Sequence, residues 1–196
     1  MSDSTLQANA GRRTLEQRLW QLESERAIRD LCHRYADCAD RRDWARFMTA
    51  FHDGATHAQT DIHASIPQVE NTKFASGVFA TFRETHHLIG NIEVRISGMK
   101  AVSQAYFTST HIIPAAVPLD FLPEKRRPRN LTGKDLIWWV GGRYCDELSY
   151  RDGRWAIEHR TGIHDWEYWS EAVNGGFGRN AAAAPAPVDE RLQDDR

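Results

Sequence analysis

The feature that most constrains the fold is a change in hydrophobic periodicity near residue 86. Before it, apolar residues recur three or four positions apart, as at Ile28, Leu31, Tyr35 and Cys38, which is typical of amphipathic helices. After it, the chain consists of runs rich in β-branched and aromatic residues, separated by turn signals. Helices followed by antiparallel hairpins predict an α+β domain, in which three N-terminal helices cover a curved, mainly antiparallel sheet rolled into a cone-shaped barrel.

The helical part divides into three predicted helices. The first begins at Thr14, in a capping-box pattern, and ends after Cys38. The second covers residues 44–51 with Asp43 as its N-cap, and the third covers residues 73–85. The apolar stripe at the start of the first helix is out of phase with the later one. This shift predicts either a bend or packing of the first turns on a partner subunit.

Strands are expected once the periodicity changes, together with one earlier strand over residues 55–63 that carries His57 and His63. The predicted strands of the second half are residues 86–96, 101–113, 136–150 and 155–169. Residues 114–134, with four prolines, predict a long loop of the kind that forms a lid, a binding loop or a contact with a neighbour. The basic cluster in this loop, residues 125–127, is interpreted as solvated.

The chain is expected to form one domain over residues 14–172, between a disordered N-terminus (1–13) and a flexible C-terminal tail (173–196). The formal charge of -2 and the pI near 6.5 give no basic field, so nucleic acid is not an expected partner. No apolar run reaches the length of a membrane span. Three cysteines without metal-type spacing are typical of reduced thiols, which predicts a cytoplasmic protein.

Asp40 is the first candidate for a functional residue. The first helix should be ending there, and Asp43 serves the next helix, so Asp40 has no evident capping role. A carboxylate turned towards the interior needs a partner, and His87, at the start of a predicted strand, can supply one. Such a pair fixes the imidazole tautomer so that the free ring nitrogen accepts a proton. The alternative is a helix-end cap and a hydrogen-bonded core histidine.

An apolar cavity is expected at the open end of the cone. Phe51, Trp138 and Trp166 are candidates to line it, although aromatic residues of this kind also form ordinary core. Arg160 and His164 lie at even spacing on the last strand, hence on one face, and are candidates for its mouth; a surface salt bridge is the alternative for Arg160. The nine histidines show no familiar ligand spacing, so neither a metal nor another cofactor is expected.

The order of elements and several short motifs together resemble the SnoaL-like branch of the nuclear transport factor 2-like superfamily, over about residues 14–170. The motifs that carry the resemblance are Ile28-Arg29-Asp30-Leu31, Arg34-Tyr35, Asp40-Arg41-Arg42-Asp43-Trp44, Thr85-His86-His87-Leu88-Ile89-Gly90-Asn91, Gly142-Arg143-Tyr144, Arg151-Asp152-Gly153-Arg154-Trp155 and His159-Arg160. Within this superfamily, the sequence is similar to scytalone dehydratase, bile acid 7α-dehydratase, hexachlorocyclohexane dehydrochlorinase and the polyketide cyclases. The resemblance implies that Asp40 orients His87, which removes a proton from the substrate.

The resemblance also implies catalytic roles for His111 and Tyr35. His111 would act as a general acid or anchor a substrate oxygen, with a strand-end histidine bonded to backbone as the alternative. Tyr35 would hydrogen-bond a substrate oxygen, or pack its ring in the core. The sequence departs from the family pattern at Ala39, where a tyrosine is found in one branch, and at His164, where another has an arginine.

These observations predict a cofactor-independent lyase, of dehydratase or retro-aldol type, or an isomerase or cyclase, acting on a small hydroxylated aromatic or polycyclic compound. The competing class is a non-catalytic ligand carrier or the small subunit of an aromatic-ring-hydroxylating oxygenase. A homo-oligomer, dimer or trimer, is expected because the exposed sheet face is commonly a dimer surface in this superfamily.

Overall fold

The computed structural model describes residues 13–129 and 133–172 of the protein. Apart from Arg13, the predicted disordered N-terminus and flexible tail lie outside these ranges. The helical elements are α2 (Leu15–Arg41), α3 (Trp44–Met48), α4 (Gln68–Thr81) and the short 3-10 turn η1 (Glu124–Arg126). The strands are β1 (Phe51–Gln59), β2 (His63–Pro67), β3 (Glu84–Ser97), β4 (Lys100–Ile113), β5 (Leu136–Arg151) and β6 (Arg154–Glu171).

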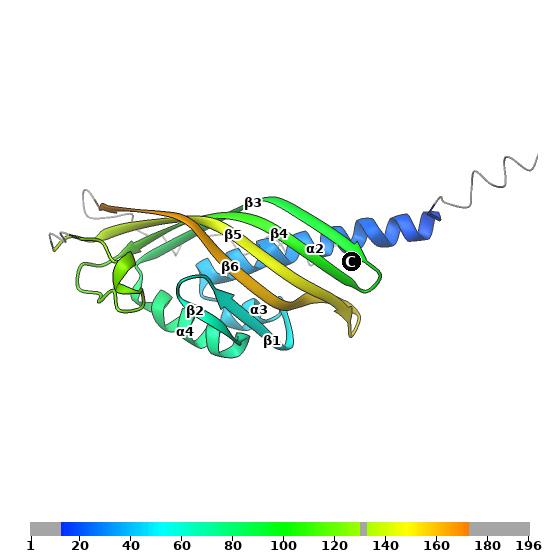
Figure 1. Ribbon diagram of the computed structural model, residues 1–196, viewed down its shortest axis with the longest axis horizontal. Helices are drawn as coiled ribbons and strands as arrows, with labels where there is room; N and C mark the ends of the chain where they lie inside the picture. The colour runs from blue at the N-terminus through cyan, green and yellow to red at the C-terminus, as the bar shows by residue number, and fades with distance from the viewer. Residues whose placement is uncertain (1–12, 130–132, 173–196) are drawn as a thin grey trace, which may run out of the picture.

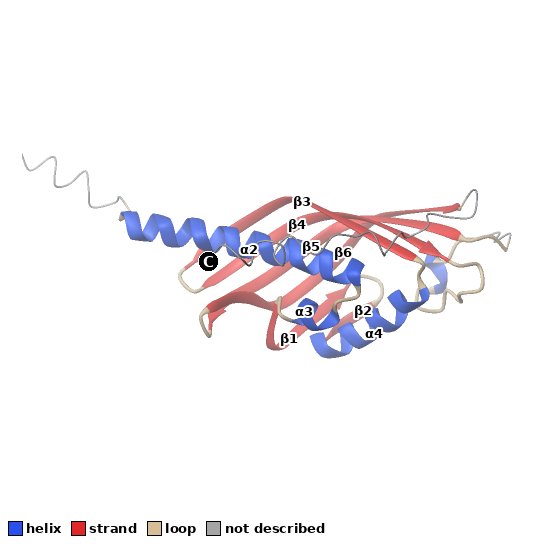
Figure 2. Ribbon diagram, turned by 180° about the vertical axis from the view of Figure 1, so that it is seen from behind, coloured by secondary structure: helices blue, strands red, loops and turns tan. Residues whose placement is uncertain are grey.

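The six strands form one curved sheet in the order β2-β1-β6-β5-β4-β3. Neighbours pair antiparallel except for β1 and β6, which run parallel. After the β1–β2 hairpin, the chain crosses through α4 to the opposite edge, β3, and returns strand by strand to β6. The three α-helices lie on the concave side of the sheet (Figures 1 and 2). The predicted α+β class and the curved, mainly antiparallel sheet under three helices are confirmed; the sheet stays open between its edges β2 and β3.

The predicted helix caps are present. Thr14 and Gln17 form the complete capping box of α2. Asp43 caps α3 by accepting a hydrogen bond from a backbone N–H at 3.1 Å. Between the two helices, Arg42 takes a left-handed conformation with φ of 61°, which ends α2 abruptly. This sharp turn leaves Asp40 in the last turn of a helix that runs against β3.

The region between α3 and β3 differs from the prediction. The single strand expected over residues 55–63 is the hairpin of β1 and β2, which reverses near Asp61, where φ is 64°. Helix α4 begins at Gln68, directly after Pro67, rather than at residue 73. Its first turn buries polar side chains, Gln68 and Asn71, against the hairpin. Apolar periodicity does not mark such a turn, which explains the late predicted start.

Helix α2 is one unbroken helix, so the out-of-phase stripe does not mark a bend. Its first turns extend beyond the strands (Figure 1), and Leu15, Leu19 and Leu22 are 77%, 53% and 64% exposed. Packing of this segment on a partner subunit stays a prediction, as does the homo-oligomer. No helix among the described residues is long and apolar enough to cross a membrane.

A fully buried ion pair lies beneath α2 and corrects the interpretation of Arg160. This side chain is 0% exposed and donates to both carboxylate oxygens of Asp146, at 2.6 and 2.7 Å. Its guanidinium lies 4.0 Å from the ring centroid of Tyr35 and 4.4 Å from that of Tyr144. Arg160 is therefore neither a surface salt bridge nor a wall of a cavity, and it ties β5, β6 and α2 together.

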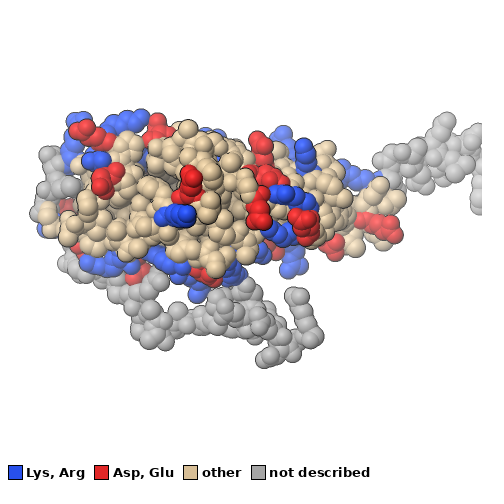
Figure 3. Space-filling model, turned by 90° about the horizontal axis from the view of Figure 1, so that it is seen from below, with Lys and Arg blue, Asp and Glu red and all other residues tan. Residues whose placement is uncertain are grey.

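On the surface, acidic and basic side chains are interspersed (Figure 3). Asp37 on α2, for example, lies 2.7 Å from Arg41 and 3.4 Å from Arg46. The basic cluster at residues 125–127 is only partly solvated: Arg126 forms a two-bond ion pair with Glu167 on β6, at 3.1 and 2.8 Å. The long loop is thereby attached to the last strand.

Candidate active site

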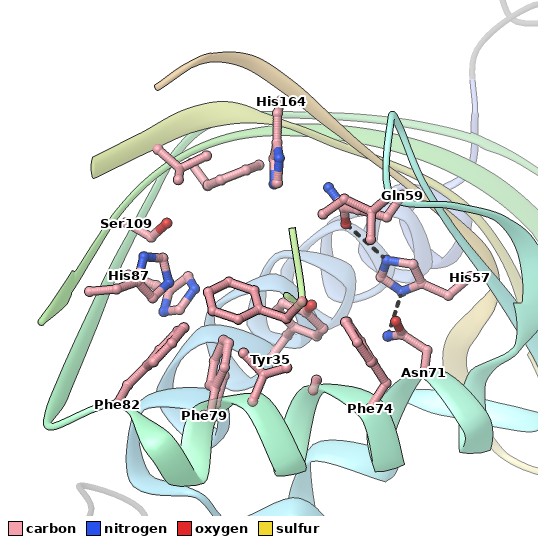
Figure 4. Close-up of a pocket in the computed structure, with 18 of the residues that line it drawn as sticks. Tyr35, His57, Gln59, Asn71, Phe74, Phe79, Phe82, His87, Ser109 and His164 are labelled. Carbon is pink, nitrogen blue, oxygen red and sulfur yellow. Dashed lines mark hydrogen bonds between the residues drawn. The ribbon is translucent and has the colours of Figure 1, made fainter. Parts of the chain in front are cut away.

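A cavity lies between the concave face of the sheet and the inner side of α4 (Figure 4), with about 810 Å³ of empty space when its mouth is counted. About 120 Å³ of this space is open to the centre of a water-sized sphere, which is less than the roughly 300–1,000 Å³ usual for drug-sized ligands. Its apolar lining is Ala39, Trp44, Phe47, Ile62, Phe74, Ala75, Val78, Phe79, Phe82, Phe107, Phe121, Leu122, Trp138 and Val140. Its polar lining is Tyr35, His57, Gln59, His63, Asn71, His87, Ser109, His111, Tyr144 and His164. Polar groups thus lie within a mainly aromatic cavity.

Asp40 forms hydrogen bonds to His87 with both of its carboxylate oxygens. Oδ1 lies 2.7 Å from the ring nitrogen Nδ1 of His87, and Oδ2 accepts from its backbone N–H at 2.8 Å. Burial opposes ionisation of Asp40, but the side-chain hydrogen bond and charge interaction with His87 outweigh it and lower the pKa of the carboxyl. The carboxylate therefore holds the proton of His87 on Nδ1, and Nε2 is left as an acceptor on a ring that lines the cavity.

The left-handed residue that ends α2 also supports this pair. Arg42 Nη1 donates to the Asp40 backbone carbonyl and to Thr85 Oγ1, each at 2.6 Å, while Nη2 lies 3.3 Å from the Phe79 carbonyl. One guanidinium thus joins the end of α2, the start of β3 and α4. Sequence reasoning missed this role of Arg42, because only the fold brings the three elements together.

His111 lies on β4 beside His87, with ring centroids 5.5 Å apart. Burial, with a smaller contribution from the neighbouring His87, lowers the pKa of His111 to about 3, so its ring is neutral at pH 7. Nδ1 lies 3.3 Å from the backbone carbonyl of Trp138, which can only accept. The proton is therefore on Nδ1, and Nε2 of this histidine is an acceptor as well.

Tyr35 points inward from α2 into the cavity (Figure 4). Its ring packs 4.6 Å from that of Phe47, and its hydroxyl hydrogen-bonds with that of Tyr144. Burial raises the pKa of Tyr144 well above its ordinary value, with a smaller contribution from Tyr35. Each hydroxyl has one proton and only one of the two is used in this hydrogen bond, so the other is left for another acceptor.

A second polar group occupies the opposite end of the cavity from His87 (Figure 4). His57 Nδ1 lies 3.2 Å from the amides of both Gln68 and Asn71, and Nε2 lies 3.3 Å from the amide of Gln59. Asn71 also contacts His63 Nε2 at 3.1 Å. The prediction placed His57 on a strand without a role; the even spacing of His57 and Gln59 on that strand was the available signal.

The structure brings some of the predicted site residues into the cavity and leaves others outside. Tyr35, His87, His111, Trp138 and His164 line it. The predicted substrate-binding residues Phe51, Trp166 and Arg160 do not.

Arg160 is held by its ion pair with Asp146, and the other two residues also have structural reasons for lying elsewhere. Phe51 is core, behind Phe47. Trp166 is 50% exposed because of a β-bulge in β6. Gly141 pairs with Trp166 and Gly142 pairs with His164, so Asp165 is an extra residue between them. The bulge reverses the inward face of β6 after His164.

The buried histidines predict a pH-dependent stability. Burial is the main cause that lowers the pKa of His57 and His111 to about 3 and that of His164 to about 4. In the unfolded chain these histidines bind protons near pH 6.5, whereas in the folded protein they do not. The free energy of unfolding is therefore highest above pH 6.5 and falls as the pH is lowered towards 4. Urea midpoints between pH 8 and 4.5 measure this, and His111→Gln should reduce the slope by about one proton. An unchanged slope would contradict the burial of a neutral His111.

Comparisons with known proteins agree with this architecture. Residues 20–161 match the family model of the SnoaL-like domain, and the chain belongs to this family. No curated protein sequence matches the chain.

Three solved structures show the same fold. One is a protein from Kribbella flavida, with a TM-score of 0.62, 22% identity, and coverage of 76% of this chain and 95% of that one. Another is a putative scytalone dehydratase from Novosphingobium aromaticivorans, with a TM-score of 0.58, 20% identity, and coverage of 76% of this chain and 88% of that one. The third is a hexachlorocyclohexane dehydrochlorinase from Novosphingobium barchaimii, with a TM-score of 0.60, 18% identity, and coverage of 82% of this chain and 97% of that one.

Proposed function

We propose that the protein is a lyase that eliminates water from a small hydroxylated aromatic or polycyclic compound, with His87 as its general base. The observation that carries this proposal is the double hydrogen bond of Asp40 to the ring and the backbone of His87. It places an acceptor nitrogen at an aromatic cavity and stabilises the imidazolium that forms there. Membership of the SnoaL-like family supports the proposal, since dehydratases and dehydrochlorinases share the fold.

In the proposed reaction, His87 Nε2 takes a proton from a substrate carbon, and the electron pair of that C–H bond becomes the new double bond. The neighbouring C–O bond breaks, and the leaving oxygen receives the proton back from His87 and departs as water. Tyr35 donates a hydrogen bond to that oxygen while it carries developing charge. His111 cannot be the acid suggested by the resemblance, because its neutral ring offers only Nε2 as an acceptor; it holds a substrate hydroxyl instead.

A retro-aldol cleavage has the same requirements, with the proton taken from a hydroxyl oxygen instead of a carbon. The two reactions differ in their products, since one releases water and the other an aldehyde. Product analysis by mass spectrometry separates them.

Asp40→Asn tests the proposal. The wild-type protein and the variant are tested on a panel of hydroxylated aromatic compounds and steroids, and turnover is followed by mass spectrometry. An asparagine amide donates to Nδ1, which forces the His87 proton onto Nε2 and removes the base, so turnover should fall about 100-fold or more. Asp37→Asn is the matched control: it changes an exposed acid one turn earlier on α2 and should keep wild-type turnover. Equal turnover of the two variants would refute the proposal.

A further inference from the structure

Two buried polar atoms at the far end of the cavity have no hydrogen-bond partner among the described residues. One is a terminal amide atom of Gln59 on β1, and the other is Nδ1 of His164 on β6. Buried polar groups are nearly always paired, so each of these atoms needs an explanation. Since both residues line the cavity, a bound molecule is a natural partner. Which kind of molecule depends on which atom of Gln59 faces the cavity.

The oxygen and nitrogen of an amide exchange by a half-turn, so their positions follow from the surrounding hydrogen bonds. The series of hydrogen bonds that sets these positions begins at His63, whose Nδ1 lies 2.9 Å from the backbone carbonyl of Ala64. A carbonyl only accepts, so Nδ1 carries the proton, which leaves Nε2 as the acceptor. Asn71 must then turn its –NH₂ towards His63, which places its oxygen at 3.2 Å from His57 Nδ1.

A second, independent series of hydrogen bonds leads to the same result. The hydroxyl of Thr72 lies 2.9 Å from the backbone carbonyl of Gln68 and 3.0 Å from the sulfur of Met48, both acceptors, so its proton is used there. Its oxygen accepts from the –NH₂ of Gln68 at 3.0 Å, which turns the Gln68 oxygen towards His57 Nδ1 at 3.2 Å. Two oxygens therefore face this ring nitrogen.

His57 must consequently carry its proton on Nδ1. Burial, with the charge of Arg160, lowers its pKa to about 3, so the ring holds one proton only and Nε2 is an acceptor. The amide of Gln59, 3.3 Å from Nε2, has to donate to it. This orientation of the amide leaves the Gln59 carbonyl oxygen at the unpartnered position facing the cavity.

The strand register places His164 on the strand beside Gln59. Gln59 is paired with Gly162 across β1 and β6, and His164 is the next residue of β6 on the same face. A Cβ at position 162 would collide with the Gln59 amide, so the glycine is what allows that side chain to lie over β6. The Gln59 amide and the His164 ring thus line the same cavity from adjacent strands.

We propose that Gln59 and His164 form an anchor for a hydroxyl group of the substrate, at the end of the cavity away from Asp40 and His87. The hydroxyl donates to the Gln59 oxygen and accepts from the His164 ring. The phenyl rings of α4 lie between the two ends (Figure 4), so the substrate class is a phenol-type compound with an apolar ring system between the anchored hydroxyl and the reacting group. The inference rests on the proposed function, because it treats the cavity as the substrate site.

The tautomer of His57 is the first test. Nitrogen-15 NMR of the full chain, with the His57 signals assigned from a His57→Gln variant, distinguishes a protonated ring nitrogen from an unprotonated one. We expect the proton on Nδ1. A proton on Nε2 would turn the –NH₂ of Gln59 towards the cavity and overturn the inference.

Ligand binding is the second test, and it requires no turnover. The probes are 2,6-dihydroxynaphthalene, with a hydroxyl at each end, and 2,6-dimethoxynaphthalene, which has the same ring system and no hydroxyl. The wild-type protein should bind the diol about tenfold more tightly, because one buried acceptor is otherwise unpaired. Gln59→Met should bring the ratio close to one. Gln104→Met, the same change outside the cavity on β4, should keep it near ten.

The outcomes separate the inference from the proposed function. A tenfold ratio that depends on Gln59 supports the anchor even if no compound in the panel is turned over. A ratio that survives in Gln59→Met overturns the anchor, even if turnover depends on His87.

Discussion

His87→Gln is expected to reduce turnover by about 10³-fold or more, the largest effect on activity of any single change in the cavity. Glutamine is close to histidine in size and keeps the backbone N–H that donates to Asp40. It cannot take up a proton, so it removes the base while leaving the cavity in place. The affinity for 2,6-dihydroxynaphthalene should therefore change only a few-fold, because neither the aromatic walls nor the far end of the cavity is altered.

His86→Gln is the matched control for this change. His86 is the neighbouring residue of β3 and is exposed, because successive side chains point to opposite faces of a sheet. The control should retain wild-type turnover. Retained turnover in His87→Gln would remove His87 as the base, whereas loss of ligand affinity along with turnover would indicate damage to the cavity instead.

Asp146→Ala is expected to have the largest effect on stability, about 3–5 kcal/mol of unfolding free energy. Both side chains of the Asp146–Arg160 pair are 0% exposed. Removing the carboxylate leaves a buried guanidinium without its counter-charge, and burial of an unpaired charge is far more costly than loss of a hydrogen bond. Urea unfolding measures the effect as a lower midpoint with an unchanged m value.

Asp165→Ala is the control, because Asp165 also forms a two-bond pair, with Arg143 at 2.9 Å, but on the surface. That change should cost about 0–1 kcal/mol. Replacing both members of the buried pair together, with Asp146→Leu and Arg160→Met, should recover most of the stability, since no uncompensated charge remains. Equal losses for Asp146→Ala and Asp165→Ala would contradict the structural role of the buried pair.

Several parts of this protein could be predicted from local sequence. The helical stripe at Ile28, Leu31, Tyr35 and Cys38 is buried in α2 as its spacing requires. Both helix caps and the hairpins of β3 to β6 also follow from residues close in the chain, because caps and tight turns are local interactions. A partner for Asp40 could be inferred from its position alone, since a carboxylate without a cap role has to be satisfied elsewhere.

The rest of the site was decided by the tertiary structure, for identifiable reasons. A single inserted residue, Asp165, reverses the facing of β6, so Trp166 lies outside while His164 lies inside. Arg160 is buried because Asp146 on the adjacent strand compensates its charge, and nothing near it in sequence indicates that. The orientation of Gln59 depends on the backbone carbonyls of Ala64 and Gln68, through the side chains of His63, Asn71, Thr72, Gln68 and His57.

The sequence by itself thus determined the class of fold and most helices and strands, apart from the β1–β2 hairpin and the start of α4, because periodicity, caps and turns act over a few residues. Only the tertiary structure decided which polar side chains share a cavity and which of their atoms donate or accept. Those properties depend on strand register, bulges and hydrogen bonds between residues far apart in the chain, and no local pattern encodes them.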